Sequence, residues 1–238
     1  MLDKYHNDDN GRIRVSRQQA SAFAKDVAGD FNPIHDPDSK RFCVPGDLLF
    51  ALVLEKYGLS QHMRFEFSGL VGDGVTLNFP DSDSPHIDIS DDKGKRYLSI
   101  ERSGDISTDP SLVLALTVAY VEFSGQTFPQ LLVPLMAEHG VMINPDRPLV
   151  IYQSMAITLN RLDIGNPELE LTGSGLEVNG KRGLARLGFR LTADGETIGE
   201  GEKSMVLSGL RPFEAERVER LVDGYLADKQ AYLDQRAS

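Results

Sequence analysis

One stretch of the chain places a carboxylate and an imidazole five residues apart, Gly29-Asp30-Phe31-Asn32-Pro33-Ile34-His35-Asp36. Its proline fixes its own φ and pushes the preceding residue out of helical conformations, so the segment is predicted to be a stiff, extended loop. A stiff loop suits a catalytic pair, because it holds two side chains in one mutual geometry. The same residue types are also ordinary turn chemistry, in which Asp and Asn accept hydrogen bonds from nearby backbone amides. The residues alone leave both interpretations open.

The stretch is predicted to lie between a surface helix and a buried helix. Upstream, Ser16 and Gln19 form a capping box, which predicts a helix over 17–28 that ends at the following glycine. Downstream, residues 47–57 are mostly apolar, which predicts a buried helix ending at Gly58. The free amides and partial positive charge at the start of the buried helix are expected to face the pair.

Alternating apolar and polar residues predict antiparallel strands in both halves of the chain. In the second half, Asn-Gly at 179–180 and Asp-Gly at 194–195 are strong hairpin turns. The apolar run 112–121 fits a strand or a helix, and we favour a helix; residues 130–139 are predicted to form a second buried helix. The predicted strands are 12–15, 63–67, 75–79, 86–89, 97–100, 149–159, 169–178, 183–192 and 197–207.

Residues 27–35, Val-Ala-Gly-Asp-Phe-Asn-Pro-Ile-His, resemble the signature of the MaoC-like, (R)-specific enoyl-CoA hydratases (hydratase 2), and the chain looks closest to a bacterial branch of that family. The resemblance implies a hotdog fold, in which an antiparallel sheet wraps a long buried helix. It implies that Asp30 and His35 hold the water that is added to a trans-2-enoyl thioester. The backbone N–H of Gly46, at the start of the buried helix, would stabilise the thioester oxygen.

The order of predicted elements repeats weakly, which indicates an α+β tandem, or double, hotdog with two long buried helices wrapped by antiparallel sheet. The expected units are 1–105, which carries the Asp/His motif, and 106–210, followed by a C-terminal amphipathic helix within 211–238. The second unit has Gln126 and Thr127 where the motif should recur, and these are poor acid–base groups. One site per chain is therefore expected, with residues 126–128 forming part of its wall.

Five further residues are assigned to substrate binding. The apolar side chains of Phe31, Phe42 and Leu49 would line an acyl tunnel, although core packing explains them equally well. Asn32 belongs to the motif itself, and Arg41 would meet a CoA phosphate. The expected partner is an acyl-CoA or acyl-carrier thioester.

Departures from the family signature keep two other functions open. Ala28, Arg41 and Pro45 stand where the family usually has other residues, and the segment after the motif is short. These differences motivate a non-catalytic acyl-thioester or lipid-binding hotdog protein. The third alternative is an acyl-CoA thioesterase, which would use a carboxylate on the buried helix, Asp47 or Glu55.

The composition of the 238 residues excludes several classes of protein. A net charge of −11 argues against nucleic-acid binding through a general basic surface. Cys43 is the only cysteine, so neither an intrachain disulfide nor a cysteine-based metal site is expected. With no signal segment, no apolar run of membrane-spanning length and no nucleotide-binding motif, we expect a soluble, cytoplasmic monomer or homodimer without metal or cofactor.

Overall fold

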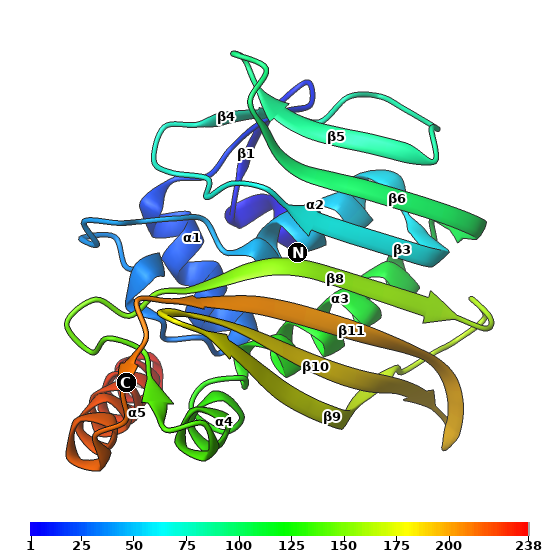
Figure 1. Cartoon of the computed structure of the whole chain (residues 1–238). Coiled ribbons are helices and arrows are strands. Elements are labelled where there is room, and N and C mark those ends of the chain that lie inside the picture. Colours follow the sequence, from blue (N-terminus) through cyan, green and yellow to red (C-terminus); the bar gives the residue numbers. More distant parts are fainter. Residues whose placement is uncertain (238) are drawn as a thin grey trace.

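The computed structural model describes residues 1–237, and it shows an α+β protein built on a ten-stranded antiparallel sheet (Figure 1). The strand order is β1-β2-β4-β5-β6-β3-β8-β11-β10-β9. Strands from the two halves of the chain meet where β3 pairs with β8, for example at Phe65 opposite Met155. The strands are β1 (Asn7–Asp9), β2 (Arg12–Arg14), β3 (Leu59–Phe67), β4 (Thr76–Asn78), β5 (His86–Asp91), β6 (Arg96–Ser107), β8 (Val150–Leu159), β9 (Glu168–Asn179), β10 (Arg182–Ala193) and β11 (Glu196–Ser208).

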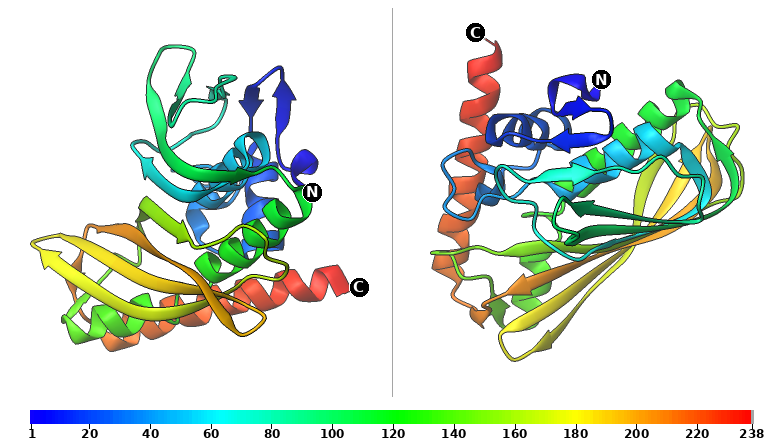
Figure 2. Two further views of the ribbon diagram at one scale, coloured as in Figure 1. Left: turned by 90° about the vertical axis from the view of Figure 1, so that its right-hand side faces the viewer. Right: turned by 90° about the horizontal axis from the view of Figure 1, so that it is seen from above.

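Two long helices pack against each other and against the inner face of the sheet (Figure 2). They are α2 (Gly46–Tyr57) and α3 (Pro110–Gly125). An antiparallel sheet wrapped around buried helices is a hotdog arrangement. The remaining elements are α1 (Arg17–Phe23) with a π-helical turn (Ala24–Ala28), 3-10 turns at Leu2–Lys4 and Pro33–His35, α4 (Leu132–Glu138), α5 (Ala215–Ala237), and a small sheet of β7 (Val141–Met142) with β12 (Arg211–Pro212). No helix formed by residues 1–237 has the length and apolar character needed to cross a membrane.

The core lies between the two long helices and the sheet. α2 is apolar on nearly every face, so it is buried almost throughout, as its sequence predicts. Phe50 of α2 packs its ring against Phe65 of β3 and Tyr120 of α3, with ring centroids 5.1 Å and 4.6 Å away. Burying one such side chain contributes about 1.5–3 kcal/mol, so this three-way contact is a main connection between helices and sheet.

The second buried helix is α3, and the assignment of that role to residues 130–139 is wrong. The apolar run 112–121 is helical, as favoured, and its helix contacts α2. Residues 130–139 instead give the short α4, whose apolar side chains pack into a smaller cluster with residues of β9, β10 and β11. Pro134 explains the late start of α4, because a proline fits only within the first turn of a helix.

The end of α3 approaches the predicted loop very closely. Gly125 is the last residue of α3, and a Cβ added to it would lie 1.7 Å from the carbonyl oxygen of Ala28. Ala28 comes two residues before Asp30. The second half of the chain therefore sets the position of the motif in the first half.

Candidate active site

The helix before the motif forms for the reason that its sequence indicates. The Ser16 side chain accepts a hydrogen bond from the Gln19 amide at 3.2 Å, and the Gln19 side chain accepts one from the Ser16 amide at 3.0 Å. α1 continues into the π-helical turn, and Gly29 ends it with φ +62. The predicted helix over 17–28 is therefore present, and its end delivers Asp30 to the interior.

The loop uses turn chemistry and presents the pair at the same time. The Asn32 amide donates to Asp30 Oδ1 at 2.9 Å, and the Asn32 side chain accepts from the Ile34 amide at 3.2 Å. Pro33 begins the 3-10 turn that ends at His35. One carboxylate oxygen of Asp30 thus fixes the loop, while the other, Oδ2, lies 3.7 Å from His35 Nε2. The two interpretations of this stretch are compatible.

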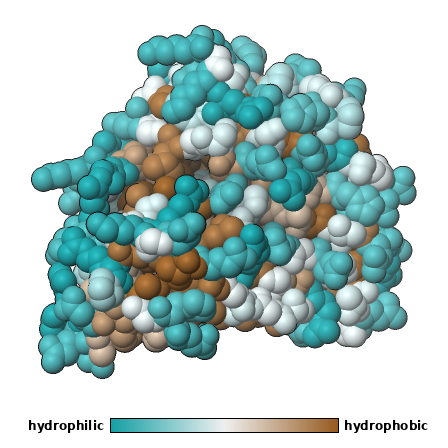
Figure 3. Space-filling model, viewed as in Figure 1, coloured by the Kyte–Doolittle hydropathy of each residue, from teal (hydrophilic) through white to brown (hydrophobic). Residues whose placement is uncertain are grey.

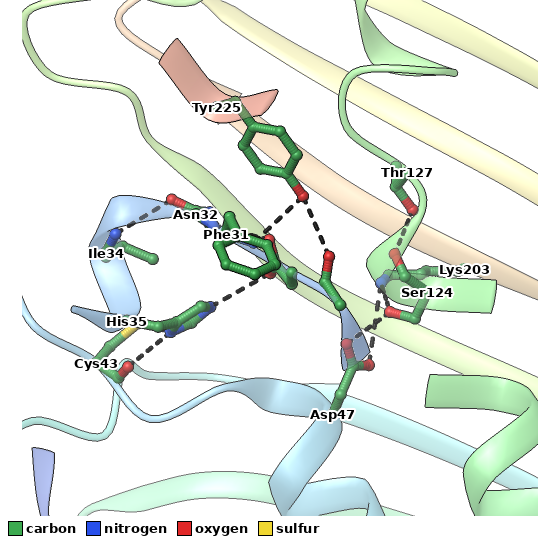
Figure 4. Close-up of polar contacts among 12 residues, drawn as sticks. Phe31, Asn32, Ile34, His35, Cys43, Asp47, Ser124, Thr127, Lys203 and Tyr225 are labelled. Carbon is green, nitrogen blue, oxygen red and sulfur yellow. Dashed lines mark hydrogen bonds and ion pairs between the residues drawn. The ribbon is translucent and has the colours of Figure 1, made fainter. Parts of the chain in front are cut away.

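The orientation of His35 follows from its other ring nitrogen (Figure 4). Nδ1 lies 2.8 Å from the Cys43 carbonyl oxygen, which only accepts, so in the neutral ring Nδ1 carries the proton. Nε2 is then an acceptor that faces Asp30 Oδ2. The side chains are 11% exposed for His35 and 24% for Asp30, and this exposed surface faces a cavity. An ionised Asp30 and a neutral His35 therefore offer two acceptors to one small ligand.

The cavity has a volume of about 280 Å³ and draws its wall from both halves of the chain. Apolar side chains dominate its lining, among them Leu49, Leu132, Ile143, Val150 and Met205. Thr127 and Phe128 line it as predicted, whereas Gln126 is exposed. In Figure 3 apolar surface gathers on the left-hand side of the face shown, interrupted by polar side chains.

The structure gathers six of the eight predicted site residues around this cavity. They are Asp30, Phe31, Asn32, His35, Gly46 and Leu49. Phe42 is not on the wall, because its ring is buried under the guanidinium of Arg17, 4.9 Å from the ring centroid. Arg41 is exposed and does not line the cavity either. The prediction that Phe42 lines the tunnel is wrong, since its ring packs under Arg17 instead. The contact of the exposed Arg41 with a CoA phosphate stays a prediction.

The surroundings of Asp30 raise its affinity for a proton. Burial raises the pKa of Asp30, and the charge of Asp47 raises it further. Three groups oppose this shift: His35, the Asn32 amide and Lys203. The carboxyl therefore has a pKa above its ordinary value, closer to the range in which a general base works well.

A second polar cluster on the same wall joins Asp47, predicted only for the thioesterase alternative, to Ser124 and Lys203, which were not predicted as site residues. Ser124 donates to Asp47 Oδ2 at 2.6 Å, and Lys203 donates to Ser124 Oγ (Figure 4). Lys203 Nζ lies 4.0 Å from Asp47 Oδ1. The lysine is 4% exposed and the aspartate 8%. Burial lowers the pKa of Lys203 by more than the charges of Asp47 and Asp30 raise it. One signal in the sequence indicated a buried lysine: Lys203 is two residues from Met205, so the two side chains share one face of the strand.

Within residues 1–237, no group of three His, Cys, Asp or Glu side chains is placed to hold a metal ion. The donors on the cavity wall are instead arranged in the two clusters just described, a carboxylate with an imidazole and a carboxylate with an ammonium. Such groups suit proton transfer and the stabilisation of charge on an organic ligand.

One known family matches most of the sequence. A family model described as "Protein of unknown function (DUF3581)" matches residues 1–216. The chain belongs to this DUF3581 family. No curated protein matches the sequence.

Solved structures with some likeness to this DUF3581 member share little sequence with it. A hotdog-fold protein of unknown function from Alicyclobacillus acidocaldarius has a TM-score of 0.48 at 10% identity, covering 89% of this chain and 98% of that one. A MaoC-like dehydratase gives 0.43 at 10%, covering 87% and 99%. A TesB protein of Mycobacterium avium subs paratuberculosis gives 0.44 at 11%, covering 71% and 89%. Likeness at this level assigns no function to the chain.

The DUF3581 match ends just inside α5, and this helix closes the cavity. The Tyr225 hydroxyl accepts from the Phe31 amide at 3.2 Å and donates to the Gly29 carbonyl at 3.5 Å. Its ring also meets Phe31 and Phe128 edge-on. The sequence predicts an amphipathic helix within 211–238. The helix is present, and its buried tyrosine packs on the motif loop, on both sides of Asp30.

Proposed function

We propose that this protein is a hydro-lyase of the MaoC-like type, which adds water to an enoyl thioester or removes it from a 3-hydroxyacyl thioester. The observation that carries the proposal is the pair Asp30–His35, held 3.7 Å apart on the wall of a largely apolar cavity. An apolar cavity with a few convergent polar groups is the usual form of a small-molecule site. The MaoC-like signature in residues 27–35 adds support.

The chemistry follows from the two acceptors. A water molecule that donates one hydrogen to Asp30 Oδ2 and the other to His35 Nε2 keeps its lone pairs free for carbon. As the water oxygen bonds to C3 of the enoyl group, Asp30 takes a proton from it, and the C2=C3 electron pair moves toward the thioester oxygen. C2 then receives a proton from the Asp30–His35 pair. The raised pKa of Asp30 suits this alternation between base and acid.

Gly46 is the proposed donor to the thioester oxygen. It is the first residue of α2 and lines the cavity, so its amide belongs to the free N–H groups of a helix N-terminus. A single backbone donor of this kind is worth about 3–4 kcal/mol of barrier in comparable sites. Gly46 also has to be small, because an added Cβ would lie 2.7 Å from the Tyr152 ring.

A single-turnover hydration assay on crotonyl-CoA and longer enoyl-CoAs tests the proposal. Asp30→Asn is expected to lower the rate by roughly 10²–10⁴-fold, the usual contribution of a positioned acid–base group. Asp38→Asn is the matched control, because Asp38 is exposed in the same segment and does not line the cavity. Folded wild-type protein without turnover on any chain length would refute the proposal. If Asp30→Asn then binds the thioester as tightly as the wild type, the protein is a non-catalytic binding module.

Thioester hydrolysis is a second candidate, and Asp47 favours it. Asp47 lies on the buried helix α2 and lines the cavity, and its Oδ1 is buried without a hydrogen-bond partner in the described part of the chain. Glu55, the other carboxylate on this helix, does not reach the cavity. Release of free thiol from a saturated acyl-CoA, which has no double bond to hydrate, separates hydrolysis from hydration.

We also infer that the chain consists of two hotdog units, over 1–105 and 106–210. Strands β1 to β6 come from the first part, with β6 running two residues past 105, and β8 to β11 come from the second; each part contributes one long helix. The Asp/His pair belongs to the first unit, while Ser124 and Lys203 come from the second. Under this division the second unit shapes a site whose acid–base groups lie in the first.

A further inference from the structure

Three side chains from three elements form the second polar cluster of the cavity. Asp47 comes from the first turn of α2, Ser124 from the last turn of α3, and Lys203 from β11. All three are more than nine-tenths buried, and all three line the cavity. The Asp30–His35 chemistry described above uses none of them.

The cluster leaves hydrogen-bonding capacity free on the cavity wall. An ammonium has three N–H donors, and in the described residues Lys203 uses one of them, toward Ser124 Oγ. Asp47 Oδ1, at 4.0 Å, is too far away to accept another as a normal hydrogen bond. The ring of Tyr152 lies under the ammonium with its centroid at 4.2 Å, which favours a cation without satisfying its donors. A buried cation is therefore available to a ligand that brings an acceptor.

Stability does not account for this cluster. Burying an ammonium and a carboxylate removes both from water, and replacing such a pair by apolar side chains is often neutral or stabilising. The contacts in the cluster do explain orientation. Ser124 donates to Asp47 and accepts from Lys203, so it fixes both charged groups with one hydroxyl.

The ammonium also lies at the reacting end of the cavity. Tyr152 lies next to both Lys203 and Gly46. Its ring is beneath Lys203 Nζ, and a Cβ added to Gly46 would lie 2.7 Å from its Cδ1. Lys203 is close enough to Asp30 for its charge to lower the pKa of that carboxyl. The start of α2, the Asp30 carboxylate and the Lys203 ammonium therefore surround one region of the cavity.

We propose that Lys203 donates a hydrogen bond to the thioester carbonyl oxygen and stabilises the negative charge that develops there, with Asp47 and Ser124 as positioning residues. This assignment rests on the proposed function. When water oxygen bonds to C3, the C2=C3 pair moves toward the carbonyl and one pair collects on its oxygen. The proton of the water goes to Asp30, and Lys203 keeps its own protons throughout. The ligand chemistry is thus an α,β-unsaturated or 3-hydroxyacyl thioester whose oxygen lies between Gly46 N–H and Lys203 Nζ.

A conjugated cinnamoyl thioester of CoA tests the assignment without requiring turnover. Its absorption moves to longer wavelength when a cation or donor polarises its carbonyl. We expect a saturable shift with the wild type and with Asp30→Asn, and its loss with Lys203→Met. Ser124→Ala should reduce the shift, because the ammonium then loses its only hydrogen-bond anchor among the described residues. Lys181→Met is the matched control, since Lys181 is exposed and does not line the cavity.

A second variant covers the case in which Lys203→Met does not fold, because that change leaves Asp47 buried without its cation. The double variant Asp47→Asn/Lys203→Met removes both charges and should fold and also lose the shift. In the hydration assay, loss of the Lys203 donor should lower kcat by roughly 10²–10³-fold with little change in KM, as expected for a group that acts in the transition state.

The outcomes separate this inference from the proposed function. Binding of the probe with no shift, or with the same shift in Lys203→Met, overturns the role of Lys203 and leaves the Asp30–His35 hydration proposal intact. A shift that depends on Lys203 in a protein that hydrates no enoyl-CoA supports the carbonyl site and refutes hydration. Failure of the wild type to bind the probe at any concentration overturns both.

Discussion

Gly125, at the end of α3, lies against the backbone of Ala28 just before the motif, and its replacement by alanine should lower both stability and activity. The new Cβ would lie 1.7 Å from the Ala28 carbonyl oxygen and 2.6 Å from the Ala28 carbonyl carbon. Both are backbone atoms, so no change of side-chain rotamer relieves the overlap. Ordinary contact begins near 3.4 Å, and the two segments must separate by about 1.7 Å, the difference between 3.4 and 1.7.

This displacement sets the expected magnitudes. Overpacking a well-packed core costs typically about 1–3 kcal/mol, and a clash against backbone belongs at the upper end, near 3 kcal/mol. For a chain of this size, that corresponds to a fall in Tm of roughly 6–12 °C. Asp30 follows Ala28 by two residues, so it moves relative to the wall supplied by the second half. Misplacement by about 1 Å is enough to cost a rate on the order of 10²-fold.

Urea unfolding, with the midpoint and slope both measured, is the assay for stability, and hydration of crotonyl-CoA is the assay for the site. Gly224→Ala is the matched stability control, because Gly224 lies inside helix α5 with nothing within 4 Å of an added Cβ. That change should stabilise the protein by up to about 1 kcal/mol, the helix preference of alanine over glycine. If Gly125→Ala unfolds within 1 kcal/mol of the wild type, the close approach of α3 to the motif is refuted.

Three further substitutions test the loop and the helices beside it. Asp30→Asn should raise the free energy of unfolding at pH 7. Because the pKa of Asp30 is raised, the folded state binds the proton more tightly than the unfolded chain does. Ionisation of Asp30 therefore lowers stability at pH values above its ordinary pKa of 3.8. The gain should shrink as the pH falls toward that value, and lower stability than the wild type at pH 7 would contradict the burial argument. Tyr225→Phe leaves the buried Phe31 amide without its partner and should cost about 1–3 kcal/mol in urea unfolding; an unchanged midpoint would show that α5 does not anchor the loop. Ser16→Ala removes the helix cap and should lower Tm through a loss of about 1 kcal/mol, whereas an equal Tm would mean that the capping box contributes nothing.

Features set by neighbouring residues were predictable from the sequence. The capping box at Ser16, the helix end at Gly29 and the buried helix ending at Gly58 all depend on contacts within a few residues. The turn at 194–195 is present for the same reason, with φ +51 at Asp194 and +79 at Gly195. The long strands of the second half follow directly from such turns, because a two-residue turn fixes which residues pair.

Predictions that needed the direction of a side chain in a loop, or the choice between two apolar segments, were less successful. Phe42 and Arg41 lie in a loop whose course depends on what packs against it, and neither side chain lines the cavity. The choice of 130–139 as the second central helix failed because apolar content alone does not say which segment reaches the core. Pro134, inside that segment, was the signal against it.

The second polar cluster could have been predicted from two buried charges in the sequence. Lys203, Met205 and Leu207 are two residues apart on one strand, so alternation places a lysine on the apolar face. Asp47 is likewise a carboxylate at the start of a helix that is otherwise buried. A buried charge is costly unless it meets an opposite charge, so two isolated buried charges of opposite sign predict each other. That pairing predicts, from the sequence, that β11 lies beside the start of α2, and it brings there the cation that the thioester oxygen is proposed to meet.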